Sequence, residues 1–284
     1  MDRKTDQNQN VIGQAAGVPY VALPPPGGPR RDASVVLAWH LMDPPRSQAA
    51  FAAAVPVDGV DAWRVHLGLP MTGARLLAGG WDEIYRLASE DAVRNMHWPV
   101  ARAAAEELGP AWVSLRGQLG IDAVQPAGVM GGSAGAGIAQ LALAEHLTDV
   151  STAVLISPVI RLRAAVEAVG RRFGITYPWD QETEAIARRL DFVERTPEIV
   201  ERHPRLQILV IVGEDDDRAG FLEPAADLAA ASPDRVTLVT IPGMGHALAE
   251  EPGIDPAPQT PHAAAVDREA TRWFRGHLRT AGSP

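Results

Sequence analysis

The sequence predicts an α/β fold, in which a mostly parallel sheet is covered by helices on both faces. The first observation behind this prediction is the alternation, along 284 residues, of short apolar runs with longer stretches of good helix formers. The second is a glycine-rich turn, within residues 127–146, that leads directly from an apolar run into a helical stretch. With 46% hydrophobic residues, the chain can bury the core that a single domain of this size needs.

Strands are predicted where apolar and β-branched residues gather in short runs bounded by Gly, Pro or polar residues. Runs that are apolar throughout indicate strands that are buried on both faces of the sheet. The segments predicted as strands are Val18–Leu23, Ser34–Trp39, Trp63–Leu69, Ala127–Gly131, Ala153–Ser157, Leu206–Val212 and Val236–Ile241.

The two ends of the chain differ in character. Residues 1–17 begin with a polar stretch and are expected to form a flexible tail, while residues 18–284 are expected to form one domain. The last helix is predicted at about His262–Thr280. A signal-peptide core is missing at the start, and the sequence has no apolar run of the roughly twenty residues that span a bilayer. We therefore expect a cytoplasmic protein.

Two long connections are expected to shape a substrate pocket. The first insertion, residues 70–99, contains Trp81, and the second insertion, about residues 158–205, contains Tyr177 and Trp179. The second is expected to be a helical lid. Aromatic side chains in such segments are candidates for an apolar pocket, although they could equally anchor the insertions to the body of the domain.

The glycine-rich turn has the pattern Gly-x-Ser-x-Gly, with Ser133 between Gly131 and Gly135. A serine on a sharp strand-to-helix turn is a candidate nucleophile, and small neighbours leave room for the strained backbone. Ser133 could instead only cap the following helix. A third interpretation is the glycine spacing of short-chain dehydrogenases, which Gly137 completes. That family needs a Tyr-x-x-x-Lys motif, and the only lysine of this chain is Lys4.

A nucleophilic serine needs a base, and the base needs an acid that orients it. The predicted strand Leu206–Val212 runs into three consecutive aspartates, Asp215 to Asp217, and the predicted strand Val236–Ile241 runs into His246. Taken singly, the aspartates could be a solvated turn and the histidine an exposed loop residue. Together they follow Ser133 in the order Ser, Asp, His, each at the end of a strand, and this indicates a catalytic triad.

With these residues the chain resembles the α/β-hydrolases, over roughly residues 18–280. The resemblance implies the α/β-hydrolase fold with a helical lid insertion, and the catalytic set Ser133, Asp216 and His246. Asp216 corresponds to the position where the family commonly carries its acid. The alternatives Asp215 and Asp217 stay open.

Family members also hold the oxyanion of the reaction with two backbone N–H groups. The resemblance assigns one to Ala134, the residue after the nucleophile. The other belongs to the loop after the strand Ser34–Trp39, where members usually show a histidine followed by glycine. This chain has His40-Leu41-Met42, so the donor is left open between Leu41 and Met42. Trp39 and His40 are candidates for the substrate pocket, or simply core residues at a strand end.

The function that the sequence predicts is a serine hydrolase of the carboxylesterase type, acting on an ester of a small acyl substrate, with a thioester or an amide as the alternative substrates. An acyltransferase on the same fold, a non-catalytic binding protein and an oxidoreductase are the alternatives. No metal or organic cofactor is expected. The net charge of −9 disfavours binding to nucleic acids or anionic membranes, and the absence of cysteine excludes thiolate chemistry. The oligomeric state is left open.

Overall fold

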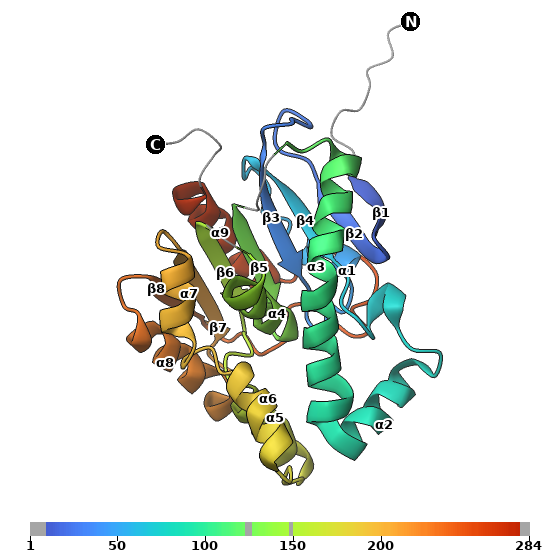
Figure 1. Cartoon of the computed structure of the whole chain (residues 1–284), viewed down its shortest axis with the longest axis vertical. Helices are drawn as coiled ribbons and strands as arrows, with labels where there is room; N and C mark the ends of the chain where they lie inside the picture. The colour runs from blue at the N-terminus through green and yellow to red at the C-terminus, as the bar shows by residue number, and fades with distance from the viewer. Residues whose placement is uncertain (1–9, 123–126, 148–149, 279–284) are drawn as a thin grey trace, which may run out of the picture.

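The computed structural model describes residues 10–122, 127–147 and 150–278. Its centre is an eight-stranded sheet with the order β1-β2-β4-β3-β5-β6-β7-β8, seen in Figure 1 between layers of helices. The strands are β1 (Val11–Ala15), β2 (Val18–Leu23), β3 (Ser34–Trp39), β4 (Ala62–Leu67), β5 (Gly128–Gly132), β6 (Thr152–Ile156), β7 (Gln207–Gly213) and β8 (Val236–Ile241).

The sheet is mixed only at one edge. Strands β1 and β2 pair antiparallel, as do β2 and β4, and every other neighbouring pair is parallel. The prediction of a mostly parallel sheet is therefore confirmed. Because parallel strands end on the same side, the loops that follow β3, β5, β7 and β8 share one edge of the sheet.

Strand β1 corrects the expectation of a flexible tail over residues 1–17. Val11 to Ala15 pair with Ala22 to Val18 of β2, although the side chains of β1 are half-exposed for most of its length. The sequence did not reveal this strand, because an edge strand with one solvent-exposed face carries few apolar residues. The rest of the expected tail, residues 1–9, lies outside the described residues.

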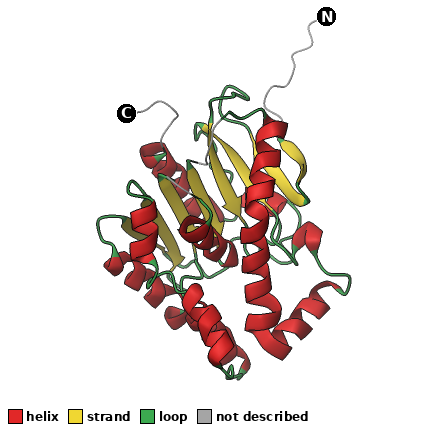
Figure 2. Ribbon diagram, viewed as in Figure 1, coloured by secondary structure: helices red, strands yellow, loops and turns green. Residues whose placement is uncertain are grey.

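Helices cover both faces of the sheet, as Figure 2 shows in red against the yellow strands. The two faces follow from the alternation of side chains along a strand: Val35 and Leu37 of β3 join one core cluster, whereas Val36 and Ala38 join another. The first cluster receives α3 (Trp98–Leu119), α4 (Ala134–Glu145), α7 (Thr196–Arg202) and α8 (Glu223–Ala231), and the second receives α1 (Gln48–Ala54) and α9 (Pro261–His277).

Both insertions are helical. The first insertion holds α2 (Gly80–Ala92) and a π-helical turn, Val93–His97, that runs on into α3. The second insertion holds α5 (Leu162–Phe173), α6 (Gln181–Arg189) and α7. Helices α2, α5 and α6 lie beyond the carboxyl ends of the strands, toward the bottom of Figure 1, whereas α7 packs on a face of the sheet. Each insertion therefore stands next to the edge of the sheet where the predicted catalytic residues follow their strands.

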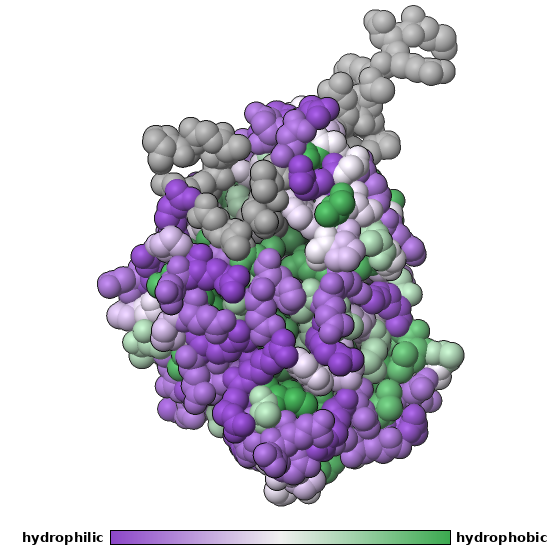
Figure 3. Space-filling model, in the orientation of Figure 1, coloured by the Kyte–Doolittle hydropathy of each residue, from purple (hydrophilic) through white to green (hydrophobic). Residues whose placement is uncertain are grey.

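The face of the molecule seen in Figure 3 is mostly hydrophilic, with purple residues over most of it and small apolar areas between them. Among the described residues, none of the helices combines the length and the apolar character that crossing a membrane requires.

Candidate active site

Ser133 lies on a sharp turn between β5 and α4. Its backbone has φ 48° and ψ −116°, a conformation that residues other than glycine rarely adopt. The turn is held on both sides, because the Ser133 N–H donates to the Ile156 carbonyl at 2.9 Å and the Ser133 carbonyl accepts from the Val159 N–H at 3.2 Å. A strained residue that its surroundings fix in this way is typical of functional sites.

The two glycines of the motif make this turn possible by close packing of backbone on backbone. A Cβ on Gly135 would lie 2.3 Å from the His40 carbonyl oxygen and 2.4 Å from that of Trp39. A Cβ on Gly131 would lie 2.4 Å from the Gly135 carbonyl oxygen. A larger residue at Gly135 would therefore push the turn away from the end of β3, and one at Gly131 would push β5 away from the start of α4.

The structure brings Ser133, His246 and Asp216 together through two hydrogen bonds. Nδ1 of His246 lies 2.8 Å from Oδ2 of Asp216, and Nε2 of His246 lies 2.8 Å from Oγ of Ser133. With Nδ1–H donating to the carboxylate, Nε2 is the acceptor for the serine hydroxyl proton. The Asp216 side chain is only 3% exposed, which protects this hydrogen bond from competition with water.

Of the three consecutive aspartates, Asp216 is the one whose carboxylate contacts His246. The carboxylate of Asp217 accepts from the Gly220 N–H at the start of the next helical turn and pairs with Arg171. Asp215 is exposed, and its backbone N–H donates to the Met244 carbonyl at 2.9 Å. This last bond ties the turn that carries Asp216 to the loop that carries His246.

A further carboxylate, Asp43, faces the same imidazole. Its Oδ2 lies 3.7 Å from His246 Nε2, and its side chain is 54% exposed. Burial lowers the pKa of His246, but the hydrogen bond and charge of Asp216, with the charge of Asp43, outweigh burial and leave the pKa above its ordinary value of 6.5. The Phe221 ring packs on the imidazole, with 4.3 Å between the ring centroids. Asp43 did not stand out in the sequence, because nothing there places it against His246.

The loop after β3 lies next to the serine turn, but its residues play different parts. His40 is fully buried, and both its ring nitrogens bond to the backbone: Nδ1 donates to the Leu41 carbonyl, and Nε2 accepts from the Leu69 N–H. Leu41 is also fully buried, and its side chain fills the space that a Cβ on Gly132 would need. Met42 is partly exposed and reaches the cavity described next.

A largely apolar cavity opens beside the serine. The cavity is narrow, with an enclosed volume of about 20 Å³, and it is open to solvent on one side. Ala134 and Met42 line it together with residues of α3, α4 and the second insertion. The other lining residues are His97, Val100, Ala101, Gly137, Ile138, Val159, Leu162, Leu190 and Phe192.

The residues predicted for the pocket are not among those that line this cavity. Trp39 is 2% exposed in the core, and His40 lies beneath the loop as described above. The rings of the other three contact charged or aromatic neighbours, and these contacts anchor the insertions. Trp81 packs against Arg46, Tyr177 packs against Trp179 and donates its hydroxyl to Asp91, and Trp179 packs against Arg163.

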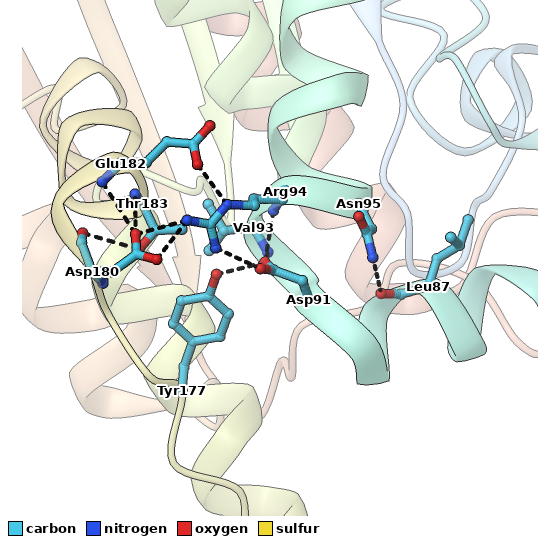
Figure 4. A network of polar contacts seen from close by, with 9 residues as sticks. All are labelled: Leu87, Asp91, Val93, Arg94, Asn95, Tyr177, Asp180, Glu182 and Thr183. Carbon is cyan, nitrogen blue, oxygen red and sulfur yellow. Dashed lines mark hydrogen bonds and ion pairs between the residues drawn. The ribbon is translucent and has the colours of Figure 1, made fainter.

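Ion pairs join the two insertions, as Figure 4 shows. Arg94, in the π-helical turn of the first insertion, contacts Asp91 of its own segment at 2.8 Å and both Asp180 and Glu182 of the second at 2.6 and 2.8 Å. Tyr177 of the second insertion donates to the same Asp91 at 2.5 Å. Because His97 follows Arg94 by one helical turn, this network also sets the position of a cavity-lining residue.

In the described residues, no group of three or more His, Asp or Glu side chains is placed so that it could hold a metal ion.

This protein is similar to known proteins in its structure but not detectably in its sequence. No protein-family model matches the sequence, and no curated protein sequence matches it. Among solved structures, TT1662 from Thermus thermophilus is 17% identical with a TM-score of 0.60, over 95% of this chain and 97% of that one. Dienelactone hydrolase from Anabaena variabilis is 19% identical with a TM-score of 0.56, over 96% and 100%. Carboxyl esterase 2 from Tuber melanosporum is 15% identical with a TM-score of 0.54, over 98% and 90%.

These similarities cover nearly the whole of this chain and, with its sheet order, give the fold. The protein has the α/β-hydrolase fold, as the sequence predicted. At such low identities the likeness says nothing of the substrate or the reaction, since one fold can carry many functions.

Proposed function

We propose that this protein is a serine hydrolase that cleaves carboxylic esters of small acyl substrates through an acyl-enzyme intermediate. The observation that carries the proposal is the unbroken chain of hydrogen bonds from Asp216 through His246 to Ser133, on a strained turn. That arrangement activates a hydroxyl that is otherwise a weak nucleophile. Esterases and a dienelactone hydrolase among the proteins of similar structure fit the same chemistry.

In the first half of the reaction, Ser133 Oγ attacks the ester carbonyl carbon while its proton passes to His246 Nε2. The C–O bond to the leaving alcohol then breaks, and the imidazolium returns the proton to the alcohol oxygen. Asp216 keeps the imidazole oriented and stabilises its charged form. In the second half, water attacks the acyl-enzyme with His246 again as the base, and the acid leaves with Ser133 restored.

We assign the role of binding the oxyanion to the backbone N–H groups of Ala134 and Met42. Ala134 is the first residue of α4, and N–H groups at a helix start lack partners within the helix. Of the two candidates in the loop after β3, Met42 is favoured because it lines the same cavity as Ala134, whereas Leu41 is packed against Gly132. One such donor is worth about a hundredfold to a thousandfold in rate.

The test is hydrolysis of p-nitrophenyl acetate and butyrate by the purified protein, beside matched p-nitroanilides and thioesters. We expect turnover of the esters and at least a ~10³-fold loss in Ser133→Ala, since removal of a triad member leaves only a small residual rate. Equal turnover by the wild type and Ser133→Ala would overturn the proposal. Faster turnover of the amides or thioesters would keep the nucleophile and change the substrate class.

A further inference from the structure

Of the described residues that line the cavity beside Ser133, only His97 has a polar side chain. The other lining residues are Ala, Gly, Val, Leu, Ile, Met and Phe. Among the described residues the His97 ring has no hydrogen-bond partner, unlike His40 and His203, whose ring nitrogens bond to the backbone. His97 is partly exposed, so its ring can exchange a hydrogen bond with water for one with a substrate group that enters the cavity.

The protonation state of His97 narrows the groups that it can bind. Burial lowers the pKa of His97 to about 4, so the ring is neutral under ordinary conditions. A neutral imidazole offers one N–H donor and one acceptor nitrogen. It suits a neutral partner, such as a hydroxyl or carbonyl group, whereas a carboxylate would have to leave water for an apolar cavity without a countercharge.

The position of the cavity tells which part of the substrate enters it. The leaving alcohol must receive its proton from His246, which does not line the cavity. Ala134 and Met42, the residues assigned to the oxyanion, do line it. The acyl side of the ester therefore points into the cavity, and the alcohol side points toward His246 and Asp43.

We infer that His97 selects acyl groups that carry a hydroxyl or carbonyl group beyond the ester carbonyl, by a hydrogen bond inside the cavity. This inference rests on the proposed function. A cavity that pairs with such a group discriminates against the analogue that lacks it, because that analogue cannot make the hydrogen bond to the imidazole. The substrates would be short hydroxyacyl or oxoacyl esters rather than plain fatty acyl esters.

The test compares p-nitrophenyl esters of butyric and 3-hydroxybutyric acid, and of hexanoic and 6-hydroxyhexanoic acid, in the wild type, His97→Phe and His97→Gln. The ratio of kcat/KM between the two members of a pair is compared across variants, which cancels their intrinsic reactivities. We expect His97→Phe to lower the hydroxy-to-plain ratio about tenfold in at least one pair, the worth of one neutral hydrogen bond. His97→Gln, which can still donate and accept, should restore part of the ratio.

The plain esters serve as the control within each variant, since their kcat/KM should stay within a few-fold in a folded His97→Phe. The same ratio in the wild type and His97→Phe for both pairs would overturn the inference.

If the wild type hydrolyses none of the esters, the proposed function fails, and the role of His97 is then tested by ligand binding alone. In that case the Kd of 3-hydroxybutyramide relative to butyramide is measured in Ser133→Ala with and without His97→Phe, and an unchanged Kd ratio would overturn the inference.

Discussion

The loops that carry Ser133, Asp216 and His246 are held in a different way from the two insertions that cover them. In the loops, backbone packs on backbone, as at Gly135 against the end of β3 and at Gly213, where a Cβ would lie 2.1 Å from the Met244 carbonyl oxygen. The insertions meet through ion pairs between partly exposed side chains, with Arg94 at the centre of Figure 4.

These two kinds of packing suit two different tasks of an enzyme of the proposed kind, the covalent chemistry and the choice of substrate. Covalent chemistry needs atoms held to within a fraction of an ångström, which close backbone packing provides. Substrate choice needs a surface whose side chains can change without moving the reacting atoms. We therefore expect changes in the loops to affect kcat most, and changes in the insertions to affect mainly KM and substrate preference.

The largest effect is expected at the acid. Asp216→Asn should lower kcat by roughly 10⁴, because the amide no longer holds the His246 tautomer that accepts the serine proton. Asp215→Asn and Asp217→Asn are matched controls in the same turn and should cost about tenfold or less. Steady-state kinetics on a p-nitrophenyl ester give the three values, and a larger loss at Asp215 or Asp217 than at Asp216 would contradict the geometry.

Gly135→Ala should damage both stability and activity. The new Cβ would collide with two backbone carbonyl oxygens at 2.3 and 2.4 Å, and neither can move without shifting β3. We expect a loss of about 3 kcal/mol or more in the free energy of unfolding, measured in urea. Gly137→Ala is the control on the same helix, since its Cβ would meet its nearest neighbour at an ordinary 3.4 Å. It should change stability by about 1 kcal/mol at most. Similar stabilities for the two variants would mean that the turn is not packed as described.

The pH profile tests the surroundings of His246. The base must be neutral to accept a proton, so kcat/KM should fall on the acid side as pH drops through the His246 pKa, which lies above its ordinary value of 6.5. Asp43→Asn removes a negative charge that raises this pKa, and the acid limb should then move to lower pH. Asp234→Asn is the control, because this exposed carboxylate is not among the groups that shift the His246 pKa, and it should leave the limb in place. An unmoved limb in Asp43→Asn would exclude Asp43 from the electrostatics of the site.

The smallest effect is expected in the insertions. Arg94→Ala removes ion pairs between exposed side chains, which contribute little to stability, but it also frees the segment that carries His97. We expect KM to rise a few-fold with kcat nearly unchanged. Arg86→Ala is the control, because its partners Glu83 and Glu90 belong to the same helix α2. A larger loss in kcat than in KM for Arg94→Ala would show that the insertions position the reacting atoms as well.

The same contrast explains how much could be predicted from the sequence. The parallel strands and the serine turn were visible because each is a local pattern, and three residue types at strand ends were enough to indicate the site. Strand β1 was missed because an edge strand carries a weak apolar signal.

The cavity could not be predicted, because Met42, His97 and Phe192 come from three distant segments that only the packed fold brings together. The aromatic residues of the insertions gave a misleading signal. Tyr177 and Trp179 are as apolar as pocket residues, but their contacts with Asp91 and Arg163 make them anchors of the second insertion.

The central claim is that Ser133 forms a covalent bond to the substrate, and an active-site-directed fluorophosphonate tests it most directly. The protein is treated with the probe and digested, and the modified peptide is identified by mass spectrometry. We expect a single adduct on Ser133 and none in Ser133→Ala, because only this serine has a hydroxyl within 2.8 Å of His246 Nε2 among the described residues. An adduct on another serine, or labelling that persists in Ser133→Ala, would contradict the account.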